Sequence, residues 1–150
     1  MSIHLENIGK RFNREWIFRG VNHIFESGKS YAILGSNGSG KSTLLQVAAG
    51  YARPTEGKVI GKLEGAESSG ENLFKEVSLA TPYLGLYEEF FLEELLAFHF
   101  KFKRIRDTLT LENLPEILKL DHALNRPVKQ FSSGMKQRLR LGLALLSDTP

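Results

Sequence analysis

Short alternating and apolar stretches dominate the first part of the chain. Ile3 and Leu5 alternate with polar neighbours, and residues 16–25 are rich in aromatic and β-branched side chains. These patterns predict two or three strands within residues 2–25. The apolar run at residues 31–34 has the length and composition of a buried strand.

The pattern continues with short elements up to about residue 81. Residues 51–61 predict a turn, with Pro54 and Gly57, followed by a short strand. Residues 65–70 are polar and small and predict a loop. Residues 76–81 alternate in their first half, which predicts another strand that ends before Pro82.

Helical spacing replaces alternation in the last part of the chain. Residues 92–102 place Leu92, Leu95, Leu96, His99 and Phe102 on one helix face. Residues 111–120 form a second amphipathic stretch, which Pro115 interrupts, and a third helix is predicted over residues 134–146. We therefore predict a β-rich part at about 1–85 and a helical part at about 86–146. On the apolar face of its helix, His99 is predicted to pack in the core or to face a partner.

Composition and charge describe an ordinary globular domain. The chain has 150 residues, enough for one domain with a core, and 41% hydrophobic and 25% charged residues. Its net charge of +3 (20 basic and 17 acidic residues) gives no reason to expect nucleic acid as a partner. The chain has no cysteine, which excludes disulfides and thiolate metal sites. No apolar stretch approaches the roughly 20 residues that cross a bilayer.

One motif carries recognisable chemistry. Residues 35–43 fit the pattern G-x-x-x-x-G-K-[ST], between the predicted strand at 31–34 and a predicted helix from Lys41 that ends near Gly50. Glycines in this pattern allow backbone conformations that bring amide groups around phosphate oxygens, at the positive end of a helix dipole. The motif therefore predicts a nucleotide-binding loop, whose residues are Gly35, Ser36, Asn37, Gly38, Ser39, Gly40, Lys41, Ser42 and Thr43.

Three side chains of this loop have separate predicted roles. Lys41 is expected to reach the β- and γ-phosphates, and the Ser42 hydroxyl is expected to bind Mg²⁺. Thr43 is expected to add a contact near the α-phosphate.

A second motif indicates the family. Residues 131–138, FSSGMKQR, are similar to the signature L-S-G-G-Q-K-Q-R of the ATP-binding subunits of ABC transporters. They depart from that signature at Phe131, Ser133 and Met135. The separation of about ninety residues from Lys41 is usual in the family, and the similarity extends along all 150 residues.

The resemblance implies a fold and a truncation. The fold is α/β, of the P-loop NTPase class, with an N-terminal β subdomain, a mononucleotide-binding core of ABC type and an α-helical subdomain. Residues 1–150 then form a partial ATP-binding domain that ends before the Walker B segment, so the C-terminal part of the fold is missing.

The resemblance also implies site residues beyond the loop. Phe12 stands where the family places an aromatic ring against adenine, and Trp16 is a second candidate. Ser132, Ser133, Gly134 and Met135 would contact the γ-phosphate of ATP held by a partner subunit. The ligands are ATP and Mg²⁺, and the activity is ATP hydrolysis.

The implied partners are a second ATP-binding subunit and membrane subunits. The two ATP-binding subunits, identical or paralogous, pair head to tail. Membrane-spanning subunits hold the pair at the cytoplasmic face of the membrane, through the helical subdomain and the loop at 82–89. Tyr83, Leu84, Leu86 and Tyr87 are candidate contacts there, although Leu86 is equally suited to the core.

The chain departs from the family at its catalytic positions. Pro82 stands where the family has a glutamine that reaches Mg²⁺ and the attacking water. The Asp-Glu pair and the switch histidine would follow Pro150, so no catalytic residue is assigned within the chain, and the chain by itself is expected to be inactive. Asp148 follows an apolar run but is rejected as the metal ligand, because its segment directly continues the signature helix.

Two other functions share these motifs. One is a soluble ABC ATPase that acts on ribosomes or DNA, although such proteins usually have longer insertions. The other is a regulatory module that binds nucleotide without hydrolysing it.

Overall fold

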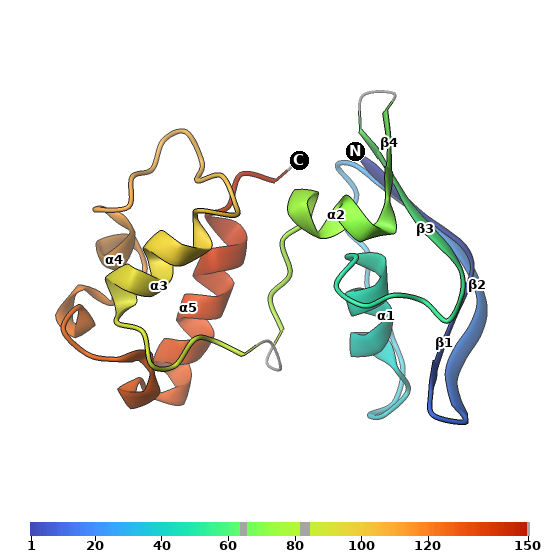
Figure 1. Ribbon diagram of the computed structural model, residues 1–150, viewed down its shortest axis with the longest axis horizontal. Helices are drawn as coiled ribbons and strands as arrows, with labels where there is room; N and C mark the ends of the chain where they lie inside the picture. Colours follow the sequence, from blue (N-terminus) through green and yellow to red (C-terminus); the bar gives the residue numbers. More distant parts are fainter. Residues whose placement is uncertain (64–65, 82–84, 150) are drawn as a thin grey trace. The chain divides into compact units, whose positions relative to one another are not determined.

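The structure, a computed structural model, describes residues 1–63, 66–81 and 85–149. The chain divides into two compact units, Met1–Val77 and Ser78–Thr149 (Figure 1). We call them the sheet unit and the helical unit and describe each by itself. The predicted division at about residue 85 stays a prediction.

The sheet unit is built on an antiparallel sheet of four strands. They are β1 (Ser2–Phe12), β2 (Glu15–Glu26), β3 (Glu56–Leu63) and β4 (Ala66–Ser69), in the order β2-β1-β3-β4. Residues 2–25 therefore hold two strands, which form a hairpin that closes with Phe12 opposite Glu15. Asn13 takes a φ of 52° in the turn, a conformation that asparagine tolerates better than most residues.

Two helices of the sheet unit bury their apolar sides against the sheet. Helix α1 spans Lys41–Ala48, as predicted, and contributes Val47 and Ala48 to the core. Helix α2 spans Gly70–Glu76 and contributes Leu73, which is fully buried. Strand residues complete this core: Leu5, Ile8 and Val59. The side chains of β1 and β3 that face inward thus hold the helix that follows the phosphate loop.

The predicted strand at residues 31–34 is wrong. The structure assigns no strand there, and Leu34 is 88% exposed. Tyr31 lies against β2 through ring contacts with His23 and Phe25, and its hydroxyl accepts a hydrogen bond from the Glu26 amide. Side chains hold this segment, and no described strand pairs with its backbone. An extended segment without a ladder partner does not form a strand.

The predictions for residues 66–81 are also wrong, and residue 65 lies outside the described residues. Ala66–Ser69 form strand β4 instead of a loop, paired with β3. Helix α2 occupies residues through Glu76, and residues 77–81 have no regular structure. Leu73 and Val77 both pack toward the core at a spacing of four residues. A spacing of four residues is helical. The short alternation that starts at Glu76 was instead interpreted as a strand.

The helical unit contains the three predicted helical stretches. Helix α3 spans Leu92–His99, α4 spans Leu114–Ile117, and α5 spans Ser133–Leu145. Two short 3-10 helices lie between α4 and α5, at Asp121–Ala123 and Val128–Gln130. Pro115 lies in the first turn of α4, so it starts this short helix and does not interrupt a longer one.

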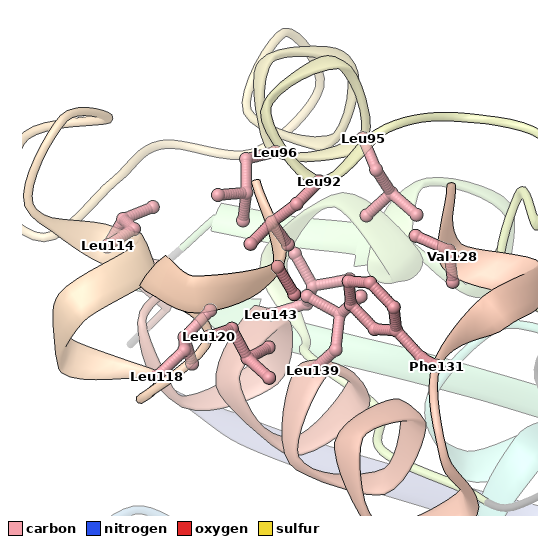
Figure 2. Close-up of a cluster of buried hydrophobic side chains, with 11 residues drawn as sticks. Leu92, Leu95, Leu96, Leu114, Leu118, Leu120, Val128, Phe131, Leu139 and Leu143 are labelled. Atoms are coloured by element: carbon pink, nitrogen blue, oxygen red, sulfur yellow. The ribbon is translucent and has the colours of Figure 1, made fainter. Parts of the chain in front are cut away.

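One hydrophobic core joins the elements of the helical unit. Figure 2 shows the side chains of α3, α4 and α5 that point toward one another. Gly142 of α5 lies so close to Leu118 that an added Cβ would stand 2.1 Å from Leu118 Cδ2. Glycine at this position lets α5 approach the end of α4. Leu86 is half-buried and packs against this core, so its core role is confirmed.

A buried polar contact closes the end of the helical unit. Ser147, which is fully buried, donates a hydrogen bond to the Leu143 carbonyl at 2.6 Å, and His99 Nε2 lies 3.2 Å from its Oγ. Burial lowers the pKa of His99, and Lys103 lowers it further, while a hydrogen bond with Leu143 opposes the shift. His99 is therefore half-buried and packs against the end of the helical unit, which agrees with the first of its two predicted alternatives.

The lowered pKa of His99 predicts that acid destabilises the protein. Above its unfolded pKa of about 6.5 the imidazole is neutral in both states, so it does not affect stability. As the pH falls through about 6.5 the unfolded chain takes up the proton first, and the free energy of unfolding decreases. Denaturant unfolding at about pH 7.5 and about pH 5 measures this loss. His99→Gln should reduce it, and the exposed His122→Gln serves as control. An equal pH dependence in the wild type and His99→Gln would contradict the assignment.

Candidate functional site: the phosphate loop and the signature turn

The phosphate loop lies in the sheet unit and leads directly into α1. Gly35, Gly38 and Gly40 have φ values of 155°, 81° and 88°, so all three glycines take conformations that other residues avoid, as predicted. An added Cβ at Gly35 would stand 2.7 Å from Ser39 Oγ, and one at Gly40 would stand 2.4 Å from Ile17 Cγ2. The contact with Ile17 places the end of the loop against β2.

Lys41 is held inside the curl of the loop. Its Nζ donates hydrogen bonds to the carbonyls of Gly35 and Ser36, at 2.9 and 2.7 Å. These contacts orient the ammonium toward the loop side of α1. Carbonyl oxygens are weaker partners for an ammonium than phosphate oxygens, because a hydrogen bond between two charged groups is stronger. A phosphate can therefore replace the two carbonyls as the hydrogen-bond partner of the Lys41 ammonium.

The start of α1 also has unpaired amide groups. Leu44 N–H donates to the Gly40 carbonyl at 2.8 Å, which is the first bond of the helix. Among the residues that the structure describes, no acceptor faces the amides of Lys41, Ser42 and Thr43. Helix starts with free amides bind anions through these donors and the helix dipole. Residues 35–39 and Ser42 are exposed, so a ligand can reach them.

The two candidate adenine rings differ in their surroundings. Trp16 is half-buried, and the guanidinium groups of Arg19 and Arg11 lie 4.2 and 5.2 Å from its ring centroid. Phe12 is 52% exposed at the end of the hairpin, with Lys10 Nζ 5.1 Å from its centroid. Two cations lie over the half-buried Trp16 ring, whereas Phe12 has one cation nearby and is the more exposed of the two rings. Phe12 stays the predicted adenine contact.

We expect Phe12→Ala to weaken the binding of ATP and GTP equally, by about 1–2 kcal/mol, because ring stacking gives affinity with little base selectivity. Fluorescence titration of both nucleotides measures the change, with Trp16→Ala as the matched variant. A loss confined to ATP, or a loss with Trp16→Ala alone, would show that Phe12 is the wrong ring.

The signature turn is an exposed loop between two apolar anchors. Phe131 is 5% exposed and belongs to the core of the helical unit, and the half-buried Met135 packs against the same core. Ser132, Ser133 and Gly134 are exposed between them. The signature has leucine where this chain has Phe131, and both side chains are apolar. Met135, which replaces the glutamine of the signature, packs against the core.

Ser132 is the N-cap of α5. Its Oγ accepts a hydrogen bond from the Met135 amide at 3.2 Å, and its carbonyl accepts one from Lys136 N–H at 2.9 Å. In the described part of the chain, no acceptor faces the amides of Ser133 and Gly134. The exposed hydroxyl and these amides form a second helix start that suits an anion.

Contacts that the sequence did not reveal join this turn to residues 88–91. Lys136 Nζ lies 2.8 Å from Glu88 Oε1, and its side chain is only 19% exposed. Lys129 pairs with Glu89 at 2.7 Å, and its amide donates to the Glu88 carbonyl. The two ion pairs join residues 48 and 40 positions apart in sequence, so no local pattern could have paired them.

The remaining predicted positions have separate outcomes. Pro82, Tyr83 and Leu84 lie outside the described residues. Tyr87 is 58% exposed and stacks on Phe90.

The rejection of Asp148 as a metal ligand stays a prediction. This residue lies three positions after Leu145, the last residue of α5, and its amide donates to the Arg104 carbonyl. Within residues 1–63, 66–81 and 85–149, no three acidic or histidine side chains gather as a metal site, and no helix is long and apolar enough to cross a membrane.

Comparisons with known proteins agree on one family. The family model described as "ABC transporter" matches residues 18–150. The chain is 34% identical over 151 residues to the "Lantibiotic transport ATP-binding protein SrtF" of Streptococcus pyogenes, covering 97% of this chain and 62% of the relative. It is 34% identical over 152 residues to the "Probable sulfate/thiosulfate import ATP-binding protein CysA" of Chlorella vulgaris, covering 99% of this chain and 64% of the relative. The chain thus spans less than two thirds of the length of these relatives.

A solved structure shows the same fold. The protein described as "ATP binding subunit of ABC transporter" superimposes with a TM-score of 0.78 at 24% identity, over 97% of this chain and 62% of that one. The predicted fold class is therefore confirmed. With the family model matching most of its length, this chain belongs to the ABC transporter family.

Proposed function

We propose that this chain is the ATP-binding part of an ABC transporter, in which ATP closes two such subunits head to tail and drives attached membrane subunits. The observation that carries the proposal is the phosphate loop. Lys41 is oriented by two loop carbonyls beside three free amides at the start of α1. A triphosphate supplies the negative charge that this arrangement lacks.

Mg²⁺ is proposed to bind next to the Ser42 hydroxyl. Ser42 is exposed at the positive end of α1, and Mg²⁺ commonly binds through few protein ligands, water and substrate phosphates. The ion would neutralise charge on the phosphates. The residues of this chain would bind and orient the nucleotide: Lys41 at the β- and γ-phosphates, Thr43 near the α-phosphate and Phe12 against the base.

The signature turn is proposed to act on the nucleotide of the other subunit. The residues Ser132, Ser133, Gly134 and Met135 would face the γ-phosphate across a two-fold interface, in which each subunit supplies the same patch. The exposed turn between buried anchors supports this role. ATP would then contact both subunits, which makes its binding a driving force for closure.

The membrane subunits are proposed to contact the helical unit and the segment that begins near Gly85. Tyr87 offers an exposed aromatic ring there. Glu88 and Glu89 tie the same segment to Lys136 and Lys129 near the signature turn. This connection supports mechanical communication between partner and nucleotide. The proposed location is the cytoplasmic face of the membrane.

Phosphate release tests the proposed ATPase activity. We expect the 150-residue chain to release no phosphate from ATP and a version extended through the Asp-Glu strand and switch histidine to do so. Phosphoryl transfer depends on Mg²⁺ placement and on orientation of the attacking water. Steady-state phosphate release by both proteins measures this. Equal turnover would restore Asp148 as a candidate, and no turnover by the extended protein would favour a regulatory module.

A further inference from the structure

Residues 88–91 pair with the part of the chain that comes just before the signature turn. The Val128 amide donates a hydrogen bond to the Phe90 carbonyl at 2.9 Å. The Lys129 amide donates one to the Glu88 carbonyl at 2.7 Å. Val128 is fully buried in the core of the helical unit (Figure 2), and the half-buried Phe90 packs against the same core. The 88–91 segment is therefore fixed beside the start of the signature.

Two ion pairs involve this segment, and they differ in burial. Lys136 Nζ lies 2.8 Å from Glu88 Oε1, and the two side chains are 19% and 46% exposed. Lys129 Nζ lies 2.7 Å from Glu89 Oε2, and these side chains are 51% and 78% exposed. Water screens an exposed pair, whereas a partly buried charge that loses its partner is costly. The pair of Glu88 and Lys136 is therefore expected to hold its two segments together more strongly.

Lys136 joins the 88–91 segment to the first turn of α5. Its amide donates to the carbonyl of Ser132, the N-cap, at 2.9 Å, which is the first hydrogen bond of this helix. Its ammonium is bound by Glu88, which lies 48 positions away in sequence. The backbone and the side chain of one residue thus connect the signature turn to a distant segment of the chain.

The needs of the helix itself do not explain a lysine at this position. A cation is unfavourable near a helix N-terminus, and the first turn of α5, which the structure describes in full, contains no acidic residue. Glu88 supplies the compensating negative charge from another part of the chain. The amides of Ser133 and Gly134, which have no acceptor in the described part of the chain, remain available to an anion. Because the charges of Glu88 and Lys136 cancel, the pair does not repel that anion.

We propose that Glu88 and Lys136 are positioning residues of the signature, whose ion pair holds the first turn of α5 in the orientation that meets the γ-phosphate of the other subunit. This inference rests on the proposed function. Neither side chain touches the nucleotide in this role. The pair restrains the turn before the subunits meet, so less conformational freedom is lost when they pair. A carboxylate outside the contiguous motif thus completes the signature.

The alternative is that the Lys136 ammonium attracts the γ-phosphate directly. In that case Glu88 would oppose the attraction by neutralising the ammonium, and removing Glu88 would strengthen pairing of the subunits. If the ion pair instead positions the turn, removing Glu88 weakens pairing. The direction of the Glu88→Ala effect therefore distinguishes the two roles.

ATP-dependent pairing of the extended protein, followed by analytical ultracentrifugation, tests the proposal. Glu88→Ala and Lys136→Met should each raise the dissociation constant of the paired subunits about tenfold, because each leaves a partly buried charge without its partner. Glu89→Ala and Lys129→Met make the same changes in the more exposed pair and should raise it less than about twofold. The exchange Glu88→Lys/Lys136→Glu should recover most of the affinity, because opposite charges face each other again.

Two further measurements separate positioning from a folding defect. Lys136→Arg keeps the charge and should recover most of the affinity that Lys136→Met loses. ATP binding by a single subunit should be the same in Glu88→Ala and the wild type, because Glu88 lies in the helical unit and the phosphate loop lies in the sheet unit. Stronger pairing of Glu88→Ala would overturn the proposal, as would equal losses in the two sets of variants. Failure of the wild-type protein to pair with ATP would instead reject the proposed function, and this inference with it.

Discussion

Lys41→Ala should reduce ATP affinity roughly 100-fold, since hydrogen bonds to charged groups contribute about 1.5–3 kcal/mol and the variant loses the only ammonium in the loop. Alanine removes the charge while leaving the glycine conformations and the amides of α1 in place. The expected result is a large loss of triphosphate binding with little change in folding. Isothermal titration with ATP in the extended protein measures it.

Lys58→Ala is the control for Lys41→Ala. Lys58 lies in the same unit, on β3, and forms an exposed ion pair with Glu6. Its loss changes the net charge equally but removes no group from the loop. If Lys41→Ala bound ATP with unchanged affinity, the assignment of the phosphate loop would be wrong. If Lys58→Ala lost as much affinity, the effect would be one of general charge.

Ser132→Arg should abolish ATP-dependent pairing of subunits while leaving ATP binding by a single subunit nearly intact. Ser132 lies in the helical unit, and the proposed contact is with the γ-phosphate held by the other subunit. A bulky guanidinium in the exposed turn would occupy the space that the phosphate needs. Analytical ultracentrifugation with and without ATP measures pairing, and phosphate release should fall with it.

Two further variants distinguish this effect from damage to the helix. Ser132→Asp keeps an N-cap for α5, since aspartate caps as well as serine, but adds negative charge that repels phosphate. It should therefore fold normally and fail to pair. Leu141→Ala changes an exposed residue farther along α5, outside the signature turn, and should retain pairing. ATP-dependent dimers of Ser132→Arg would contradict the role across the interface.

The helical part of the fold was predicted well because its signals are local. The segments around α3, α4 and α5 repeat apolar residues at helical spacing, and Ser132 has the residue type of an N-cap. The hairpin of β1 and β2 was also predictable, since its alternation and turn are adjacent in sequence. Predictions failed where an element depended on a segment distant in sequence to pair with it. Residues 31–34 are apolar enough for a strand, but no described strand pairs with them.

The candidate sites divide in the same way. The glycine spacing, Lys41 and Ser42 could be assigned from sequence, because a phosphate loop is built from consecutive residues whose backbone does most of the binding. The signature was also found as a contiguous motif. The preference for Phe12 over Trp16 came from the resemblance, whereas the cations around Trp16 could be seen only in the structure, because they come from two strands paired in the sheet.

By itself, the sequence determined the phosphate loop, the signature turn and the helices α1, α3 and α5, because each depends on residues close together along the chain. Only the tertiary structure decided which apolar segments became strands, whether the Phe12 ring stayed exposed and which side chains formed ion pairs. Glu88 meets Lys136, 48 residues away in sequence, because packing around Leu96 and Leu139 brings these parts of the chain together. Ladder hydrogen bonds, burial and ion pairs depend on neighbours distant in sequence, and packing alone brings those neighbours together.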